Sequence, residues 1–379
     1  MTAAAVRTLW VTNDFPPRSG GIEQFVANLL RLQDPSTVRV VTSRHPDADH
    51  YDASLAYEVI RAARRPLLPT PRLARRVCDE ADRFGAHLIV FGASWPLAEL
   101  ARALPLPSVA LTHGHEAGMV KVGGGPLIRH ALRGVNGIGV ISDYTRQALV
   151  PWAPATTDVH FVPPGVDVHR FSPEVSGAAV RERLGVSPAA PLVLCLSRLV
   201  ARKGQDVLIE AWPSVVHAVG DARLLIAGGG PLERSLRRRV ASLGLGASVL
   251  FAGDVPSKDL PVLHAAADVF AMPCRTRALG LDVEGLGIVY LEAQASGTPV
   301  IAGTSGGAPE AIVDSETGRV VDGRDVAGLA AALTTLLQDP ERRQAMGAAG
   351  RRFAVERYSW EAIGQRFDAL LRAAANRGD

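Results

Sequence analysis

Short apolar runs alternate with helical patterns along the whole chain, and this alternation is the feature that most constrains the fold. In the first half we expect buried strands at residues 8–12, 38–43, 87–92, 108–113, 137–142 and 159–163. In the second half we expect strands at 192–197, 223–227, 249–252, 269–272 and 300–303. Strands that alternate with helices in this way predict two α/β domains of the doubly wound type.

A segment rich in proline, P-P-G-V-D-V-H-R-F-S-P at residues 163–173, separates the two series. A chain of 379 residues suits two domains that each bury a core. We therefore expect an N-terminal domain over residues 1–168 and a C-terminal domain over residues 169–359.

The composition excludes several classes of protein. Hydrophobic residues make up 47% and charged residues 21%, as in globular rather than disordered chains. A net charge of +3 is too small to indicate a nucleic-acid partner. Three widely spaced cysteines predict buried thiols in a reducing compartment. We find neither a signal-peptide pattern nor an apolar run of about 18 residues, and therefore expect a cytoplasmic protein.

The stretch 279–310 carries the most specific pattern. It combines a glycine-spaced loop with a helix expected at 288–296, so that backbone N–H groups are presented at a helix start. Such a loop favours an anionic or oxygen-rich ligand, such as a phosphate or a sugar. The loop and the first helical position comprise Glu284, Gly285, Leu286, Gly287 and Ile288.

Glu284 and Glu292 are eight residues apart, one in the loop and one in the helix. An ionised carboxylate accepts hydrogen bonds from two neighbouring hydroxyls, which suits a hexose at one glutamate and a ribose at the other. The alternative is that Glu284 complements the helix dipole and that Glu292 is a solvated helix residue.

Two further turns follow expected strands. In S-R-L-V-A-R-K-G, the side chains of Arg198 and Lys203 can converge on a diphosphate, although a basic surface loop is the alternative. In N-D-F-P-P-R-S-G-G, the pair Gly20–Gly21 opens a helix expected at 22–32 and offers free backbone N–H groups. A glycine pair alone is a weak indication of a ligand.

Six arginines occur between residues 61 and 76 without an acidic residue: Arg61, Arg64, Arg65, Arg72, Arg75 and Arg76. They are interleaved with leucines, and Arg72, Arg75 and Arg76 are at helical spacing, which predicts a basic face that could lie on an anionic membrane. A solvated helix face is the alternative.

His113 ends an expected strand. It could bind a metal together with His115, but the sequence offers no third ligand nearby. A structural histidine is the simpler interpretation, and we expect no metal site.

The pattern E-G-L-G-I-V-Y-L-E followed by G-T-P-V-I-A-G-T-S-G-G-A-P-E resembles the signature of the retaining family 4 glycosyltransferases, in particular those that use GDP-mannose. This resemblance implies the GT-B fold, with two Rossmann-like domains facing a central cleft and a C-terminal helix (360–379) that crosses back to the N-terminal domain. It also implies GDP-mannose as donor, a phosphatidylinositol mannoside as acceptor, and peripheral association with the inner face of the plasma membrane. Neither a cofactor nor an essential metal is expected.

The resemblance also implies the roles of individual residues. Catalytic roles fall on His113, Arg198, Lys203 and Glu284. The other donor contacts fall on Gly20, Gly21, Val255, Lys258, Gly285, Leu286, Gly287, Ile288 and Glu292. The acceptor contacts fall on Asp14, Gln24 and Lys121.

Other functions stay open at this stage. One is a family 4 transferase that uses a UDP-sugar or a different acceptor. Another is a lipid-docking module that binds a sugar nucleotide without catalysis. A sugar-nucleotide epimerase would need proton-transfer acids that we cannot identify in the sequence.

Overall fold

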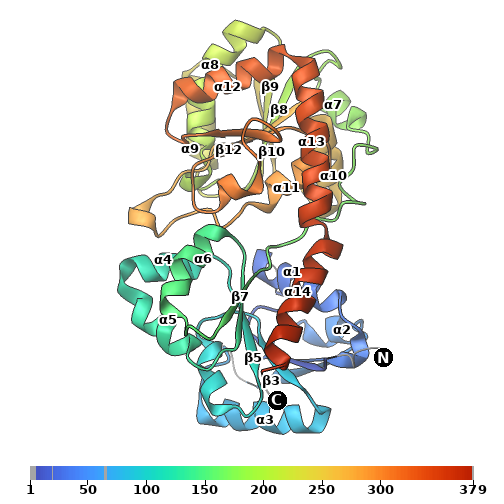
Figure 1. Ribbon diagram of the computed structural model, residues 1–379. Coiled ribbons are helices and arrows are strands. Elements are labelled where there is room, and N and C mark those ends of the chain that lie inside the picture. Colours follow the sequence, from blue (N-terminus) through green and yellow to red (C-terminus); the bar gives the residue numbers. More distant parts are fainter. Residues whose placement is uncertain (1–5, 19, 64–65, 378–379) are drawn as a thin grey trace. The chain divides into compact units, whose positions relative to one another are not determined.

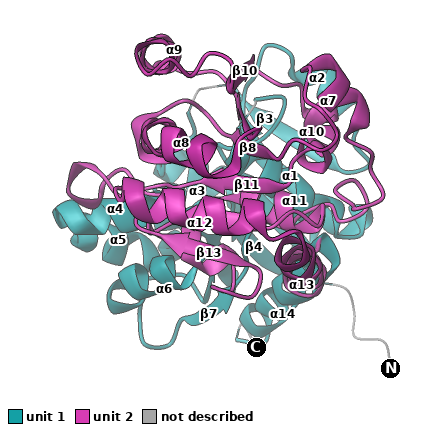
Figure 2. Cartoon of the chain, turned by 90° about the horizontal axis from the view of Figure 1, so that it is seen from above, with its two compact units in different colours: residues 1–164, 360–379 teal, residues 165–359 magenta. Residues whose placement is uncertain are grey.

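A computed structural model describes residues 6–18, 20–63 and 66–377 and divides the chain into two α/β units (Figure 1, Figure 2). Unit 1 contains residues 1–164 and 360–379, and unit 2 contains residues 165–359. The division therefore falls between Pro164 and Gly165 rather than after residue 168, and again before Trp360.

Unit 1 is built on a seven-stranded parallel sheet in the order β3-β2-β1-β4-β5-β6-β7. Its strands are β1 (Thr8–Thr12), β2 (Val38–Ser43), β3 (Glu58–Ala62), β4 (Leu88–Phe91), β5 (Ser108–Leu111), β6 (Gly137–Val140) and β7 (Asp158–Phe161). Six of them were predicted. The edge strand β3 was missed because E-V-I-R-A is mostly half-buried and has no continuous apolar run.

Helices cover both faces of this sheet, because successive side chains of a strand point to opposite faces. Leu9 and Val11 of β1 belong to one core, while Trp10 belongs to the other. The helices are α1 (Gly21–Arg31), α2 (Ala48–Asp52), α3 (Pro71–Phe84), α4 (His115–Met119), α5 (Gly125–Leu132), α6 (Asp143–Leu149) and α14 (Trp360–Ala375). The last helix, α14, packs an apolar face against this sheet, since Phe367 is buried with its ring 5.5 Å from that of Trp10.

Unit 2 contains a six-stranded parallel sheet in the order β10-β9-β8-β11-β12-β13. Its strands are β8 (Leu192–Leu196), β9 (Arg223–Ala227), β10 (Val249–Gly253), β11 (Val269–Met272), β12 (Val300–Gly303) and β13 (Gly318–Val321). Only β13, the short edge strand G-R-V-V, was not predicted. The helices are α7 (Ala178–Arg183), α8 (Gln205–Val219), α9 (Glu233–Ser242), α10 (Leu260–Ala266), α11 (Ile288–Ala295), α12 (Val326–Gln338) and α13 (Pro340–Tyr358).

Each sheet has one point at which the strand order reverses. In unit 1 it lies between β1 and β4, and in unit 2 between β8 and β11. Loops that leave the carboxyl ends of strands at such a point diverge and form the usual ligand site of an open α/β sheet. The predicted residues Lys203 and Glu284 follow β8 and β11, directly at the reversal in unit 2.

The cysteines differ in burial. Cys195 and Cys274 are buried thiols as predicted, whereas Cys78 is half-buried on α3. Within the described ranges, the structure has no helix with the length and apolarity that crossing a membrane requires.

Candidate active site

Lys203 and Glu284 form a buried ion pair at the reversal point of the unit 2 sheet. The Nζ of Lys203 lies 2.5 Å from Oε2 of Glu284, and both side chains are about 10% exposed. Lys203 ends the 3-10 turn Ala201–Lys203 after β8, and Glu284 lies in the loop between β11 and α11. The two residues come together because β8 and β11 are adjacent strands.

Gly204 allows these two loops to approach closely. Its φ is +80°, and a Cβ atom there would lie 2.1 Å from the carbonyl oxygen of Pro273. A side chain is therefore excluded both by the backbone conformation and by the neighbouring loop. Lys203, the residue before Gly204, consequently lies beside the loop that follows β11.

The backbone of Glu284 is held by the turn that follows β12. Its N–H donates to Oγ of Ser305 (3.1 Å), and its carbonyl accepts from the N–H of Gly307 (3.0 Å). The sequence T-S-G-G therefore supports the glutamate, a function that the motif alone did not indicate. Three loops, after β8, β11 and β12, thus position one carboxylate.

Arg202 and Asp282 join this cluster, and sequence reasoning missed both. Arg202 donates to Oδ1 of Asp282 (3.3 Å), and its Nε lies 3.7 Å from Glu284. Their positions next to Lys203 and two residues before Glu284 were the available indications. Two cations and two carboxylates balance within this cluster. Arg198, which also follows β8, is a further cation that does not belong to it.

Arg198 is exposed, unlike Lys203. Its guanidinium has no hydrogen-bond or ion-pair partner among the residues that the structure describes. Its backbone carbonyl accepts from Nε2 of the buried Gln205 (3.2 Å), which also donates to Oγ of Ser197 (2.9 Å). The loop is therefore held in place while the guanidinium is available to a ligand.

The start of α11 presents the predicted N–H groups. The loop residues Gly285 to Gly287 make no backbone hydrogen bond through their N–H groups within the described chain. Ile288 begins the helix and is partly exposed at 37%. Glu292, one turn later, has a side chain that is 12% exposed and lies 3.5 Å from Nε2 of His264. The two glutamates therefore have different surroundings.

Val255 and Lys258 lie after β10, at the edge of the same sheet. Val255 is half-buried, and Lys258 is exposed in the 3-10 turn Ser257–Asp259. Arg170 holds this turn by donating to Oγ of Ser257 (3.0 Å). The strand order separates both residues from Lys203 by β9.

In unit 1, His113 follows β5 and is fixed by hydrogen bonds. Its Nε2 lies 2.6 Å from the carbonyl oxygen of Gly92, which only accepts, so Nε2 carries a proton and Nδ1 is the acceptor when the ring is neutral. Its backbone N–H donates to the buried Glu116 (3.1 Å). Burial of the ring lowers the pKa of His113 from its ordinary value, although the charge of Glu116 acts in the opposite direction.

Glu116 is the buried acid of this region and was not found from the sequence. It is 0% exposed and accepts hydrogen bonds from Oγ of Ser94 (2.9 Å) and from the N–H of His113. It also lies 3.7 Å from Nε2 of His115. Glu116 therefore fixes the turn that carries His113.

The glycine turn of unit 1 lies beside an acidic residue. Gly20 and Gly21 are exposed at the start of α1, and Glu23 in the first turn is buried and pairs with Arg18 (3.0 Å). A carboxylate at this position already complements the helix dipole. Any diphosphate at this turn would also meet Arg18, which the sequence interpretation did not include.

The residues predicted for the acceptor are dispersed over unit 1. Asp14 lies 4.0 Å from Arg18, and Gln24 is exposed on α1. Lys121 lies over the ring of Tyr144, with Nζ 4.9 Å from its centroid. Lys121 belongs to a π-helical turn, Val120–Gly124, that joins α4 to α5.

The described arginines of the predicted membrane patch do not form one face. Arg61 lies on β3, where it pairs with Asp52 (2.8 Å) and donates to the carbonyl of Pro16 (2.6 Å). Its inclusion in the membrane patch was therefore wrong, because its guanidinium is committed inside unit 1. Arg64 and Arg65 lie outside the described residues. Arg72 and Arg75 are exposed on α3, and Arg76 is half-buried there.

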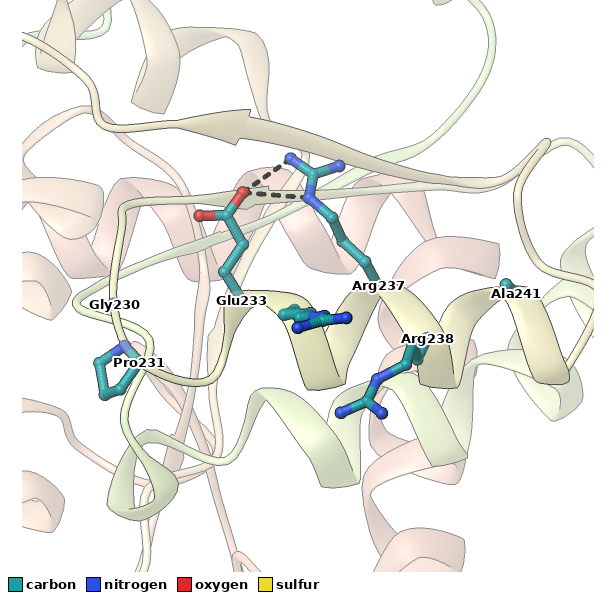
Figure 3. A pocket seen from close by; sticks show the side chains of 7 residues that line it. Gly230, Pro231, Glu233, Arg237, Arg238 and Ala241 are labelled. Atoms are coloured by element: carbon teal, nitrogen blue, oxygen red, sulfur yellow. Dashed lines mark hydrogen bonds and ion pairs between the residues drawn. The ribbon is translucent and has the colours of Figure 1, made fainter.

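An open cavity of about 570 Å³ lies along α9 in unit 2 (Figure 3). Its lining includes Arg234, Arg237 and Arg238. Arg237 pairs with Glu233 (2.9 Å) and lies over the ring of Phe251 (4.4 Å). The predicted donor and acceptor residues lie elsewhere in the described chain. We interpret the arginines that line this cavity as part of the solvated basic face of α9.

His113 and His115 stack with ring centroids 6.2 Å apart. In the ranges 6–18, 20–63 and 66–377, no three histidine, cysteine, aspartate or glutamate side chains come together as a metal would require.

The chain matches two family models that together span both units. Residues 19–170 match the model described as Glycosyltransferase Family 4, and residues 178–353 match the model described as Glycosyl transferases group 1.

Relatives and solved structures agree with these matches. The GDP-mannose-dependent alpha-(1-6)-phosphatidylinositol monomannoside mannosyltransferase of Mycolicibacterium smegmatis is 45% identical over 96% of this chain and 97% of its own. The protein described in the same words from Mycobacterium tuberculosis is 42% identical over 97% and 98%.

Two solved structures share the fold at low identity. Anabaena HepE in complex with UDP has a TM-score of 0.81 and 20% identity, covering 97% of this chain and 100% of its own. Sucrose-phosphate synthase from Thermosynechococcus elongatus has a TM-score of 0.75 and 24% identity, covering 97% and 98%. The chain therefore belongs to the family 4 glycosyltransferases, and its two parallel-sheet units are those of the GT-B fold.

Proposed function

We propose that this protein transfers mannose from GDP-mannose to phosphatidylinositol monomannoside, with retention of configuration at the transferred sugar. The observation that carries the proposal is the 42–45% identity to mannosyltransferases of this specificity, which extends over at least 96% of the chain. It therefore includes unit 1 as well as the unit that holds Lys203 and Glu284.

The charges at the reversal point of unit 2 support a diphosphate donor. When the bond between the mannose carbon and the diphosphate breaks, negative charge develops on the departing GDP. The exposed guanidinium of Arg198 is suited to donate two parallel hydrogen bonds to the diphosphate. The ammonium group of Lys203 is suited to place a compact positive charge beside it. Fixed donors of this kind lower the barrier because they need no reorganisation during the reaction.

The sugar and the nucleoside are assigned to the remaining donor residues. Glu284 and the N–H groups of Leu286 and Gly287 are assigned to mannose hydroxyls, with Gly285 and Ile288 beside them. Glu292 is assigned to the ribose hydroxyls. Val255 and Lys258, after β10, are assigned to the base.

The unit 1 assignments follow the family resemblance. His113 is assigned to the donor sugar, for which its neutral ring offers Nδ1 as an acceptor. Gly20 and Gly21 are assigned to the diphosphate, and Asp14, Gln24 and Lys121 to the acceptor. We propose that cationic side chains take the place of a divalent metal, which a reaction in excess chelator would test.

We propose that the protein acts at the inner face of the plasma membrane, where a lipid acceptor is presented. Arg72, Arg75 and Arg76 in the first half of α3 support this proposal, because the helix has no acidic residue in its first turn. Basic residues near a helix N-terminus are unfavourable to the helix dipole. Attraction to anionic lipid would offset that cost.

Nucleotide binding and product analysis test the proposal. GDP should raise the melting temperature of the protein more than UDP at equal concentration, because a ligand that binds only the folded state stabilises it according to its affinity. Purified protein incubated with labelled GDP-mannose and phosphatidylinositol monomannoside should yield a dimannoside. A larger shift with UDP, or transfer only to a soluble acceptor, would instead favour another family 4 specificity.

A further inference from the structure

His264 is a fully buried histidine that lies beside the proposed ribose carboxylate. It lies on α10 with 0% exposure, and its ring packs against those of Phe171 (5.7 Å between centroids) and Phe270 (5.5 Å). Its Nε2 lies 3.5 Å from Oε2 of Glu292 on α11. Neither ring nitrogen has a hydrogen-bond partner in the described part of the chain.

An imidazole is energetically unfavourable at this buried position. Its aromatic neighbours would pack equally well against a phenylalanine, whereas two buried nitrogens lose their hydrogen bonds to water. Glu292 is the carboxylate within reach of the ring, and its own side chain is only 12% exposed. The benefit of the imidazole is therefore best explained by its contact with Glu292.

We propose that His264 is a positioning residue that directs the carboxylate of Glu292 toward the ribose hydroxyls of the donor. In the tautomer that carries its proton on Nε2, the ring would donate to Oε2 in the donor complex and leave Oε1 to accept from the ribose. Contacts of this kind are often long without substrate and shorten in the complex. The proposal rests on the function proposed above, specifically on the role of Glu292.

The expected effect is on donor affinity rather than on the chemical step. The ribose is remote from the bond that breaks, so its contact with Glu292 is the same in the ground state and in the transition state. Loss of such a contact raises KM and leaves kcat nearly unchanged. If His264 had only a structural role, its loss would not raise KM selectively while kcat stayed nearly unchanged.

The decisive variant is His264→Phe, which keeps an aromatic ring and removes both nitrogens. Binding of GDP and of 2′,3′-dideoxy-GDP would be measured by calorimetry on the full-length protein. We expect the Kd for GDP to rise about tenfold, as on loss of a hydrogen bond to a charged group, and the Kd for the dideoxy nucleotide to stay within twofold (about the error of such a comparison). The Phe variant should have no further effect on GDP binding in a Glu292→Gln background.

Two other variants separate positioning from packing. His264→Gln returns an N–H donor near the place of Nε2 and should restore most of the GDP affinity. Phe171→Leu loosens the packing around the imidazole without removing its nitrogens, and should lower the melting temperature while GDP and the dideoxy nucleotide keep their affinity ratio. If His264→Phe does not fold, His264→Leu serves the same comparison.

Three results would overturn the proposal: an unchanged Kd for GDP in His264→Phe, an equal loss for GDP and dideoxy-GDP, or effects of His264→Phe and Glu292→Gln that multiply in the double variant. The failure of the proposed function is a different result, in which the wild-type protein binds UDP and not GDP. The ribose comparison would then be made with UDP and 2′,3′-dideoxy-UDP, since both nucleotides carry the same ribose.

Discussion

The Nζ of Lys203 lies 2.5 Å from Oε2 of Glu284, so the cation that we assign to the diphosphate and the carboxylate that we assign to the sugar form one buried ion pair. Each partner therefore has two roles, since it holds the other in place and serves the donor. Substitutions at the two positions can separate these roles, because removal of one partner leaves the other charge buried.

We predict that Lys203→Ala lowers kcat/KM at least a hundredfold, corresponding to about 3 kcal/mol for a lost electrostatic donor. It should also lower the melting temperature, because Glu284 loses its nearest cation. Adding Glu284→Gln should recover much of the melting temperature but none of the activity. Turnover of Lys203→Ala within about tenfold of wild type would refute the catalytic assignment.

Arg198→Ala should lower kcat/KM about a hundredfold while the melting temperature stays within about 1 °C of wild type. The physical reason is that its guanidinium is exposed and has no partner in the described chain, so the fold loses little. Arg223→Ala is the matched control, since Arg223 begins β9 at the other end of the same sheet and pairs with the exposed Asp221. A loss of activity equal to that of the control would contradict the assignment of Arg198.

The stability of unit 1 should depend on pH through His113. Because burial lowers the pKa of His113 in the folded state below its ordinary value of 6.5, the unfolded chain binds a proton more readily. The contribution to stability is complete above pH 6.5 and is lost as the pH falls toward the folded-state pKa. Denaturant unfolding between pH 7 and 5 should therefore show a steeper loss in wild type than in His113→Gln. His130→Gln, which removes an exposed imidazole from α5 of the same unit, is the matched control.

Membrane binding should distinguish the arginines of α3 from Arg61. The triple variant with Gln at Arg72, Arg75 and Arg76 should bind anionic vesicles more weakly, by about 1 kcal/mol per residue at low salt, and keep its melting temperature. Arg61→Gln should instead lower the melting temperature, because it breaks the pair with Asp52 and the contact over Phe15. Equal vesicle binding by the triple variant and wild type in a cosedimentation assay would refute the α3 surface.

Gly204→Ala should disrupt the Lys203 loop. Gly204 combines a φ of +80° with a carbonyl oxygen 2.1 Å from any Cβ, so both stability and activity should fall. Gly185→Ala separates the two causes, because Gly185 has a φ of +64° but no atom within 4 Å of a Cβ. The control should lose about 1–2 kcal/mol and keep its activity. Similar losses in both variants would show that the contact with Pro273 is unimportant.

Prediction from sequence succeeded where local pattern decides structure. Eleven strands were expected and found, because buried parallel strands are short continuous apolar runs. The edge strands β3 and β13 were missed because their side chains are mostly half-buried or mixed with polar residues. The same omission led to the error at Arg61, since a residue on an undetected strand was assigned to the basic membrane face.

Sequence by itself determined the alternation of strands and helices, the family signature around Glu284 and Glu292, and the placement of Arg198 and Lys203 after a strand. These are properties of neighbouring residues. Only the tertiary structure decided that Lys203 pairs with Glu284, that Arg202 and Asp282 complete the cluster, and that His264 lies beside Glu292. Those contacts join residues of different loops and helices, and they depend on the order of strands in the sheet, which periodicity along the chain does not encode.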